Sequence, residues 1–291
     1  GDIIGYSGDT GGVSGPHLHF EIRDNNQHAR NPFNYGLAIE DDIPPIIESL
    51  AFIPLNRNSY INGLSEEQVL KVNKINDIKY ILADTISVLG SIGMAVKTYD
   101  QITNQEFNFG IYKVSLSQNN QFIYSMQYDQ INWEDAKDLY TEKSYSLARK
   151  GAGKFYHLFS HHQNQSLNFV NNKSLPGIII NQSGLHNAII KIQDYAANEI
   201  EVRAVFYADT IPTFDYSVNF SNETCSIQFN PKEKIKPYFY LTDRFLKDLR
   251  VSADYYDMGN HLFVIPSIKP SFDVVEVYAK NITGIKSHST F

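Results

Sequence analysis

The chain has 291 residues, of which 42% are hydrophobic and 20% charged, a globular composition that excludes a disordered chain. Its net charge of −7 argues against nucleic acid as a partner, because phosphate binding needs a basic surface. No apolar run reaches the roughly 20 residues that span a bilayer, and the single cysteine excludes an intramolecular disulfide.

The first predicted element carries two histidines, in the sequence "GPHLHFEIR" at residues 15–23. Side chains two apart in a strand share a face, so we expect a polar face and an apolar face, the second buried in a core. The polar face holds His17, His19, Glu21 and Arg23, and the apolar face holds Leu18, Phe20 and Ile22. Two imidazoles on one face can bind zinc, although the motif alone fits two surface histidines better.

The surroundings of this motif narrow the choice. Residues 1–36 closely resemble the C-terminal end of the catalytic domain of lysostaphin/LytM-type zinc endopeptidases, which cleave the peptide part of peptidoglycan. That family has a strand of the form G-x-x-I-G-x-x-G-x-T-G, then S-G-P-H-L-H-F-E, then N-P. The matching residues are Gly1, Ile4, Gly5, Gly8, Thr10, Gly11, Ser14, Gly15, Pro16, His17, Leu18, His19, Phe20, Glu21, Asn31 and Pro32.

The resemblance implies that His19 is a zinc ligand and that His17 is its catalytic partner. The implied cofactor is Zn²⁺, which lowers the pKa of bound water and polarises the scissile carbonyl. The implied partners are peptidoglycan peptide stems or cross-bridges, and the implied location is extracytoplasmic. Glu21 either supports the zinc site or forms a surface ion pair with Arg23 or a lysine.

The resemblance also implies ligands that this sequence lacks. The family's other zinc ligands, a histidine and an aspartate four residues later, lie upstream of the motif, as does a further catalytic histidine. The 16 residues before His17 contain no histidine, and no later histidine has an aspartate four positions on. We therefore expect the missing ligands before Gly1, and we expect the 291-residue chain alone to bind zinc weakly and to be inactive.

After residue 40 the sequence is mainly β, with short runs rich in Ile, Val, Tyr and Phe between Asn, Gly, Asp and Pro clusters. Prolines at 40–48 and 207–215 indicate linkers. We predict a truncated peptidase β-sheet segment and two antiparallel Ig-like β-sandwiches, the first with a helix-containing insertion. Their ranges are 1–39, 42–209 and 210–291, the last complete or cut short at Phe291.

Two hairpins underlie the sandwich prediction. Residues 187–206 resemble the closing hairpin of bacterial Ig-like domains, with its Asp-x-x-x-Asn turn, and 273–287 repeat the outline. Residues 109–129 resemble a hairpin placed mid-sequence in such domains, with Asn119 and Asn120 at the turn. Alternation in this stretch puts Tyr112, Val114 and Leu116 on one face.

Three further features lie along the chain. Residues 132–150 are predicted to be helical, with Asn132 as N-cap and Gly151 as terminator. His157, His161 and His162 invite a second metal hypothesis, but aromatic neighbours and the lack of a nearby acid favour a polar insertion. Cys225 is expected to be a small core residue.

Three functions compete. The first is an extracytoplasmic zinc peptidase whose catalytic domain ends in this chain. The second is a degenerate, non-catalytic relative that acts as a regulator or binding module. In the third, the sandwiches carry the main function, which is adhesion, glycan binding or spacing within the envelope. Because His17 and His19 are both present, the sequence favours the enzyme.

Overall fold

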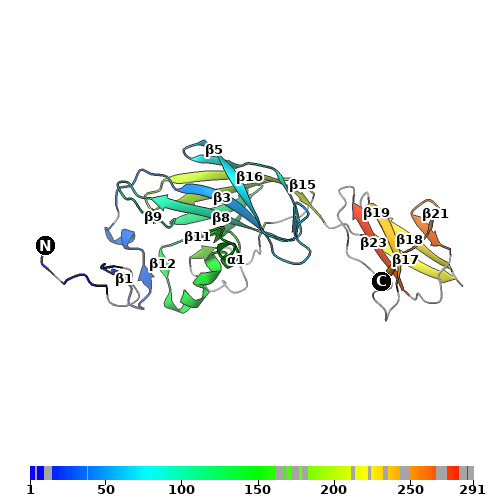
Figure 1. The fold of residues 1–291 in the computed structure, drawn as a ribbon, viewed down its shortest axis with the longest axis horizontal. Helices are drawn as coiled ribbons and strands as arrows, with labels where there is room; N and C mark the ends of the chain where they lie inside the picture. Colours follow the sequence, from blue (N-terminus) through cyan, green and yellow to red (C-terminus); the bar gives the residue numbers. More distant parts are fainter. Residues whose placement is uncertain are drawn as a thin grey trace. The chain divides into compact units, whose positions relative to one another are not determined.

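The computed structural model describes residues 1–3, 5–9, 15–37, 39–160, 167, 169–171, 177–178, 183–210, 214–221, 224–231, 235–242, 250–266, 274–281 and 287. The regular structure there is nearly all β, which confirms the predicted fold class (Figure 1). The chain divides into two compact units, Gly1–Asp209 and Thr210–Phe291.

The first unit contains these elements in chain order. They are β1 (Ile22–Arg23), β2 (Ala29–Arg30), 3-10 helix η1 (Pro32–Tyr35), β3 (Ile46–Pro54), β4 (Tyr60–Ile61), β5 (Gln68–Asn76), β6 (Lys79–Leu82), β7 (Ile86–Leu89), β8 (Ile92–Gln101), β9 (Asn108–Phe109), β10 (Lys113–Gln118), β11 (Gln121–Gln127), β12 (Gln130–Ile131), 3-10 helix η2 (Trp133–Glu142), α1 (Tyr145–Arg149), β13 (Tyr156–His157), β14 (Val170–Asn171), β15 (Gly184–Gln193) and β16 (Glu199–Asp209).

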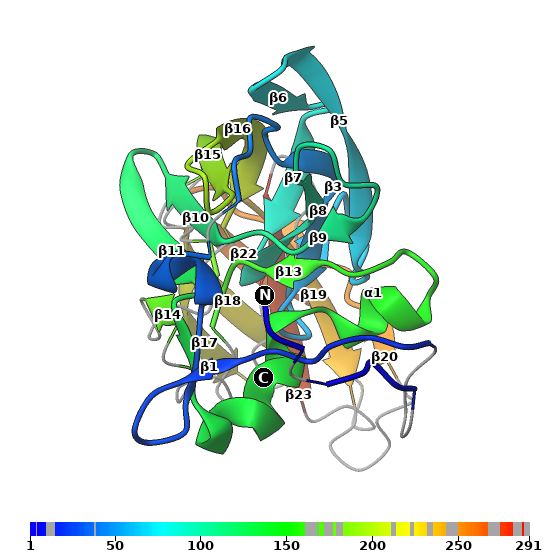
Figure 2. The same ribbon diagram turned by 90° about the vertical axis from the view of Figure 1, so that its left-hand side faces the viewer.

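A sandwich forms the body of this unit. One layer has the strand order β13-β8-β3-β5, and the other continues as β6-β16-β15-β10-β11-β14. Strand β5 joins them, because Gln68–Lys71 pair with β3 and Val72–Asn76 pair with β6 (Figure 2). Apolar side chains of both layers share one core, in which the Phe52 and Phe206 rings lie 5.9 Å apart.

Among the described strands of this unit, the pairing is antiparallel except at β16. Strand β16 runs parallel to β6 and to β7, which the prediction of a purely antiparallel sandwich did not include. Strand β5 crosses from one layer to the other. The next two strands, β6 and β7, therefore lie beside β16, and they run in the same direction as β16.

Both predicted hairpins of the first unit are present. Strands β10 and β11 are joined through Asn119 and Asn120, whose φ values of 49° and 67° suit a two-residue hairpin turn. Val114 and Leu116 of β10 are fully buried, as the alternation predicts. Strands β15 and β16 pair along their lengths, and the Asn198 backbone N–H donates to Asp194 Oδ1 across the turn (2.9 Å).

The single helix predicted over 132–150 was wrong, because the segment forms η2 and the separate helix α1. The Asn132 side chain makes no capping hydrogen bond and instead accepts one from Gln130 Nε2. Lys143 forms an extended bridge with Tyr156, which interrupts the helical path. Ser144 then caps α1, its Oγ accepting from the Leu147 N–H (3.3 Å).

The second unit contains two antiparallel sheets with a core between them. The first has the order β17-β18-β22-β21 and the second β20-β19-β23. Their bounds are β17 (Phe214–Ser221), β18 (Thr224–Pro231), β19 (Ile235–Thr242), β20 (Arg250–Ser252), β21 (Tyr256–Asp257), β22 (Leu262–Ile265) and β23 (Val274–Asn281). Of the second closing hairpin predicted at 273–287, residues 273 and 282–286 lie outside the described residues. The Ser287 N–H donates to Ala279 O (2.8 Å).

Cys225 lies in the core of the second unit, as expected, and is fully buried. Burial raises the pKa of its thiol to about 11. Because thiolate is the reactive form, we expect no reaction with an aromatic disulfide reagent in the native protein at mildly alkaline pH. One equivalent should react in guanidinium chloride. Rapid native labelling would contradict the assigned face of β18.

Candidate functional site

The segment that carries His17 and His19 is extended but only sparsely paired. His17 forms an isolated bridge with Gly8, through a 3.4 Å hydrogen bond from its backbone N–H to Gly8 O. Its Nδ1 lies 2.9 Å from Gly15 O. Regular pairing begins only at β1, so the predicted continuous strand over 17–23 was wrong.

The predicted burial of the apolar face was also wrong for this chain. Leu18 is 76% exposed and Phe20 58% exposed. Period two in the sequence separates apolar from polar side chains, but burial also needs a covering layer. Within the described residues no such layer lies over Leu18 and Phe20.

The polar alternation does bring three side chains together. His19 Nε2 lies 2.5 Å from Glu21 Oε1, and Arg23 Nε donates to Glu21 Oε2 at 2.6 Å. These hydrogen bonds, first from Arg23 and then from His19, lower the pKa of the Glu21 carboxyl. The Arg23 guanidinium in turn lies over the Trp133 ring, 5.0 Å from its centroid. Glu21 thus makes the surface ion pair that the sequence allowed, while contacting the predicted zinc ligand.

A catalytic zinc normally has three protein ligands and an open position for water. Among the described residues, neither His17 nor His19 belongs to a group of three or more side chains spaced to hold an ion. The histidine motif offers one matched ligand, and the described residues around it do not complete a zinc site.

The end of this segment is anchored to the sandwich. Strand β2 pairs with β12, and the Asn31 Nδ2 donates to Tyr128 O (3.0 Å). The Phe33 ring of η1 packs 5.0 Å from the Tyr195 ring. Residues 29–35 therefore attach the segment that carries His17 and His19, here called the histidine segment, to the sandwich.

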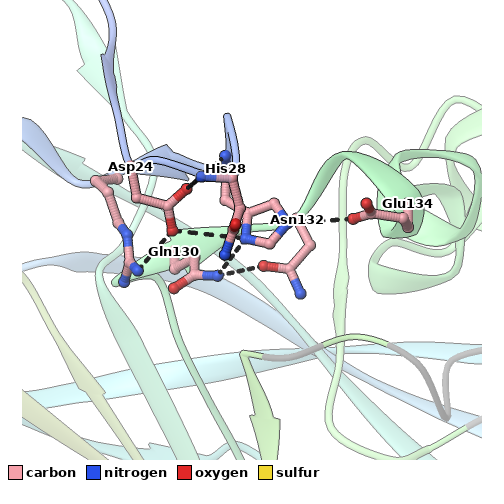
Figure 3. Close-up of polar contacts among 7 residues, drawn as sticks. Asp24, His28, Gln130, Asn132 and Glu134 are labelled. Carbon is pink, nitrogen blue, oxygen red and sulfur yellow. Dashed lines mark hydrogen bonds and ion pairs between the residues drawn. The ribbon is translucent and has the colours of Figure 1, made fainter.

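His28 lies at the centre of this anchor (Figure 3). Its Nε2 is 3.3 Å from Glu134 Oε2, and its Nδ1 is 3.1 Å from Gln130 Nε2. On the other side, its backbone N–H donates to Asp24 Oδ1 (3.0 Å). No role for His28 could be predicted from the sequence, because its partners Gln130 and Glu134 lie about a hundred residues further along the chain. Through these contacts, His28 connects the N-terminal segment to residues 130–134.

The second metal hypothesis concerned His157, His161 and His162. His157 is buried, with Nδ1 2.9 Å from Thr141 O and its ring 4.7 Å from that of Phe159. His161 and His162 lie outside the described residues.

A second set of potential ligands was missed by sequence reasoning. The carboxylates of Asp41, Asp100 and Asp194 converge, with one oxygen of each within 4.8 Å of the others. Asp41 lies in the linker before β3, Asp100 near the end of β8, and Asp194 opens the turn between β15 and β16. The one available signal was the Asp-x-x-x-Asn motif at Asp194, which predicted a turn and not a ligand.

These aspartates, here called the aspartate cluster, are partly withdrawn from water. Asp100 is only 5% exposed, and burial together with the charges of Asp194 and Asp41 raises its pKa to about 7. Burial likewise raises the pKa of Asp194. Asp100 also lines a cavity of about 470 Å³, whose wall includes Tyr112 and Tyr128.

Comparisons with known proteins add little to this geometry. No protein-family model matches the chain, and no curated protein matches it significantly. Solved structures that are similar include a chain of the mouse coronavirus receptor-binding domain complexed with its murine receptor (10% identity, TM-score 0.27) and murine CEACAM1b (8%, 0.27). Each alignment covers 70% of this chain and 92% of the other.

The human desmocollin-1 ectodomain is also similar, at 12% identity and a TM-score of 0.20, over 67% of this chain and 31% of that one. At such scores these likenesses carry no argument about function. No helix in the part of the chain that the structure describes is long and apolar enough to span a membrane.

Proposed function

We propose that residues 1–36 belong to the catalytic domain of a zinc endopeptidase that hydrolyses the peptide part of peptidoglycan. In this proposal His19 is a zinc ligand and His17 its catalytic partner. The observation that carries it is the string from Gly1 to Pro32, which matches the family pattern at sixteen positions of fixed spacing.

The exposure of the apolar side chains supports the same view. Leu18, Phe20, Ile3 and Tyr6 are between 58% and 95% exposed, in a segment whose polar positions carry the two histidines. Burying one large apolar side chain is worth about 1.5–3 kcal/mol, so such a run is costly to leave in water. A neighbouring strand or layer from the rest of a catalytic domain would cover it.

The chemistry assigned to each residue follows from its position. His19 holds its imidazole at the surface, 75% exposed, where an ion bound by further ligands can reach it. Glu21 accepts from that imidazole and orients it, a role that carboxylates often play beside metal-bound histidines. A zinc ion held there would polarise the scissile carbonyl.

The test compares the 291-residue chain with an N-terminally extended chain. We expect the extended protein to retain about one zinc after dialysis and to clear a cell-wall suspension, and the shorter chain to do neither. His19→Ala in the extended protein should lose both properties. His17→Ala should keep the zinc and lose about 10²–10⁴-fold in hydrolysis.

His261→Ala serves as the matched control, because it removes an exposed imidazole from the second unit. It should change neither zinc content nor hydrolysis. Zinc retention and lysis by the 291-residue chain alone would show that the ligand set lies elsewhere in it.

The second candidate is a non-catalytic relative that binds or regulates at the cell wall. It is favoured by one observation, that the described residues do not assemble a three-ligand zinc site around His19. An extended protein that binds cell walls but neither holds zinc nor cleaves them would establish this candidate.

A further inference from the structure

We propose that Asp41, Asp100 and Asp194 form a Ca²⁺ site in the first unit, separate from the histidine motif and independent of the proposed peptidase function. The three residues are far apart in the sequence and come from a linker, a strand end and a turn. The fold alone brings their carboxylates together.

The spacing of the carboxylates suits this ion. Ca²⁺ binds oxygen at 2.3–2.6 Å, so two oxygens on the same ion lie at most about 5 Å apart. One oxygen from each aspartate lies within 4.8 Å of the other two. The set contains only carboxylate oxygens, which hard cations prefer, whereas zinc sites normally include at least one imidazole or thiolate.

The second observation is an orphaned oxygen. Asp100 Oδ1 is buried and has no hydrogen-bond partner among the described residues, and the residue is 5% exposed. A buried carboxylate oxygen without a partner is costly, and native structures nearly always satisfy such atoms. The charges that act on this carboxyl come from Asp194 and Asp41, both of the same sign. A divalent cation would satisfy the oxygen and cancel the repulsion.

The other two ligands are held in place. Asp41 Oδ1 accepts from the Thr103 N–H and from Thr103 Oγ1, each at 3.0 Å, and from the Ile43 N–H at 3.1 Å. None of the hydrogen bonds that the described residues make to Asp41 uses Oδ2, which leaves that oxygen for an ion.

Asn198 fixes the third ligand and links it to the linker. Its Nδ2 donates to Asp194 Oδ2 (2.7 Å) and to the backbone carbonyl of Asp41 (3.0 Å). Such preorganisation lowers the entropic cost of binding. A bound ion would therefore join the linker at Asp41 to β8 and to the β15–β16 turn, and it would stiffen the connection to the histidine segment.

The experiment measures thermal unfolding of the 291-residue chain in EDTA and in CaCl₂ raised to about a hundred times the Kd, which calorimetric titration supplies. We expect a Kd of about 10⁻⁵–10⁻³ M. With Ca²⁺ at about a hundred times Kd, the transition of the first unit should rise by about 5–10 °C. Mg²⁺ at the same concentration should give a smaller rise, because it requires shorter bonds and stricter geometry.

The variant Asp100→Asn tests whether Asp100 binds the ion or has only a structural role. In EDTA it should unfold at a higher temperature than the wild type, because it removes a buried like charge, and its Ca²⁺ shift should disappear. Asp194→Asn should also lose the shift. Asp77→Asn, which changes an aspartate 91% exposed and paired with Lys74, should keep it.

Two results would overturn the proposal. One is a wild-type transition that Ca²⁺ does not move, and the other is an equal shift in Asp100→Asn and in the wild type. If methylammonium raised the unfolding temperature and Ca²⁺ did not, the aspartate cluster would instead be a binding site for an organic amine, beside the tyrosines of the cavity.

Discussion

Phe206→Ala is expected to lower the free energy of unfolding of the first unit by about 3–5 kcal/mol. Phe206 is fully buried on β16, where its ring lies 5.9 Å from that of Phe52 in the opposite layer and 5.7 Å from that of His186. Truncation removes this apolar surface from the core and leaves a cavity between the layers. Urea denaturation followed by circular dichroism measures the loss.

Tyr207→Ala is the matched control, since it truncates the adjacent aromatic residue of the same strand. Tyr207 points to the other face and is 37% exposed. We expect a loss below about 1 kcal/mol, as for other substitutions away from the core. Equal losses at both positions would mean that the register of β16 is shifted by one residue.

The second large effect is expected at Gly177. Its φ of +147° disfavours side chains, and a Cβ there would overlap the Ile92 carbonyl oxygen and lie 3.0 Å from Leu55 Cδ1. That oxygen also accepts the Ile178 N–H (2.9 Å), so it cannot move without loss of the bond. Gly177→Ala should cost about 1–3 kcal/mol for backbone strain and a similar amount for overpacking. Chemical denaturation again gives the value.

Gly184→Ala isolates the backbone contribution. Gly184 has a similar φ of +140°, and a Cβ there meets no atom within 4 Å. It should lose only the strain, about 1–3 kcal/mol. If both variants lost the same amount, the contact between 177 and β8 would not exist as described.

Local sequence patterns predicted those parts of the fold that depend on near neighbours. The hairpin at Asn119 and Asn120 followed from residues that accept positive φ, and the burial of Val114 and Leu116 followed from period two. The helix failed where a distant residue intervened, because Lys143 pairs with Tyr156. The parallel pairing of β16 with β6 and β7 could not be predicted from local patterns either, because it depends on β5 crossing between the layers.

The same distinction applies to the candidate sites. The histidine motif could be found because its residues are two apart, and its carboxylate neighbour Glu21 follows at once. The exposure of Leu18 could not be found, because alternation does not say whether a covering layer is present. The aspartate cluster could not be predicted, because Asp41, Asp100 and Asp194 lie far apart in the sequence and no local spacing connects them.

The position of β16 has a mechanical consequence. The strand is hydrogen-bonded to β15 on one side and to β6 and β7 on the other, and its last residue, Asp209, leads directly to the second unit. Where tension on the chain beyond Asp209 is directed along β16, it runs across the hydrogen bonds of both ladders. Both ladders are then loaded in shear, and their bonds must yield together rather than peel apart singly. Pulling experiments should find a high rupture force for the first unit, set by the rate of unfolding under load.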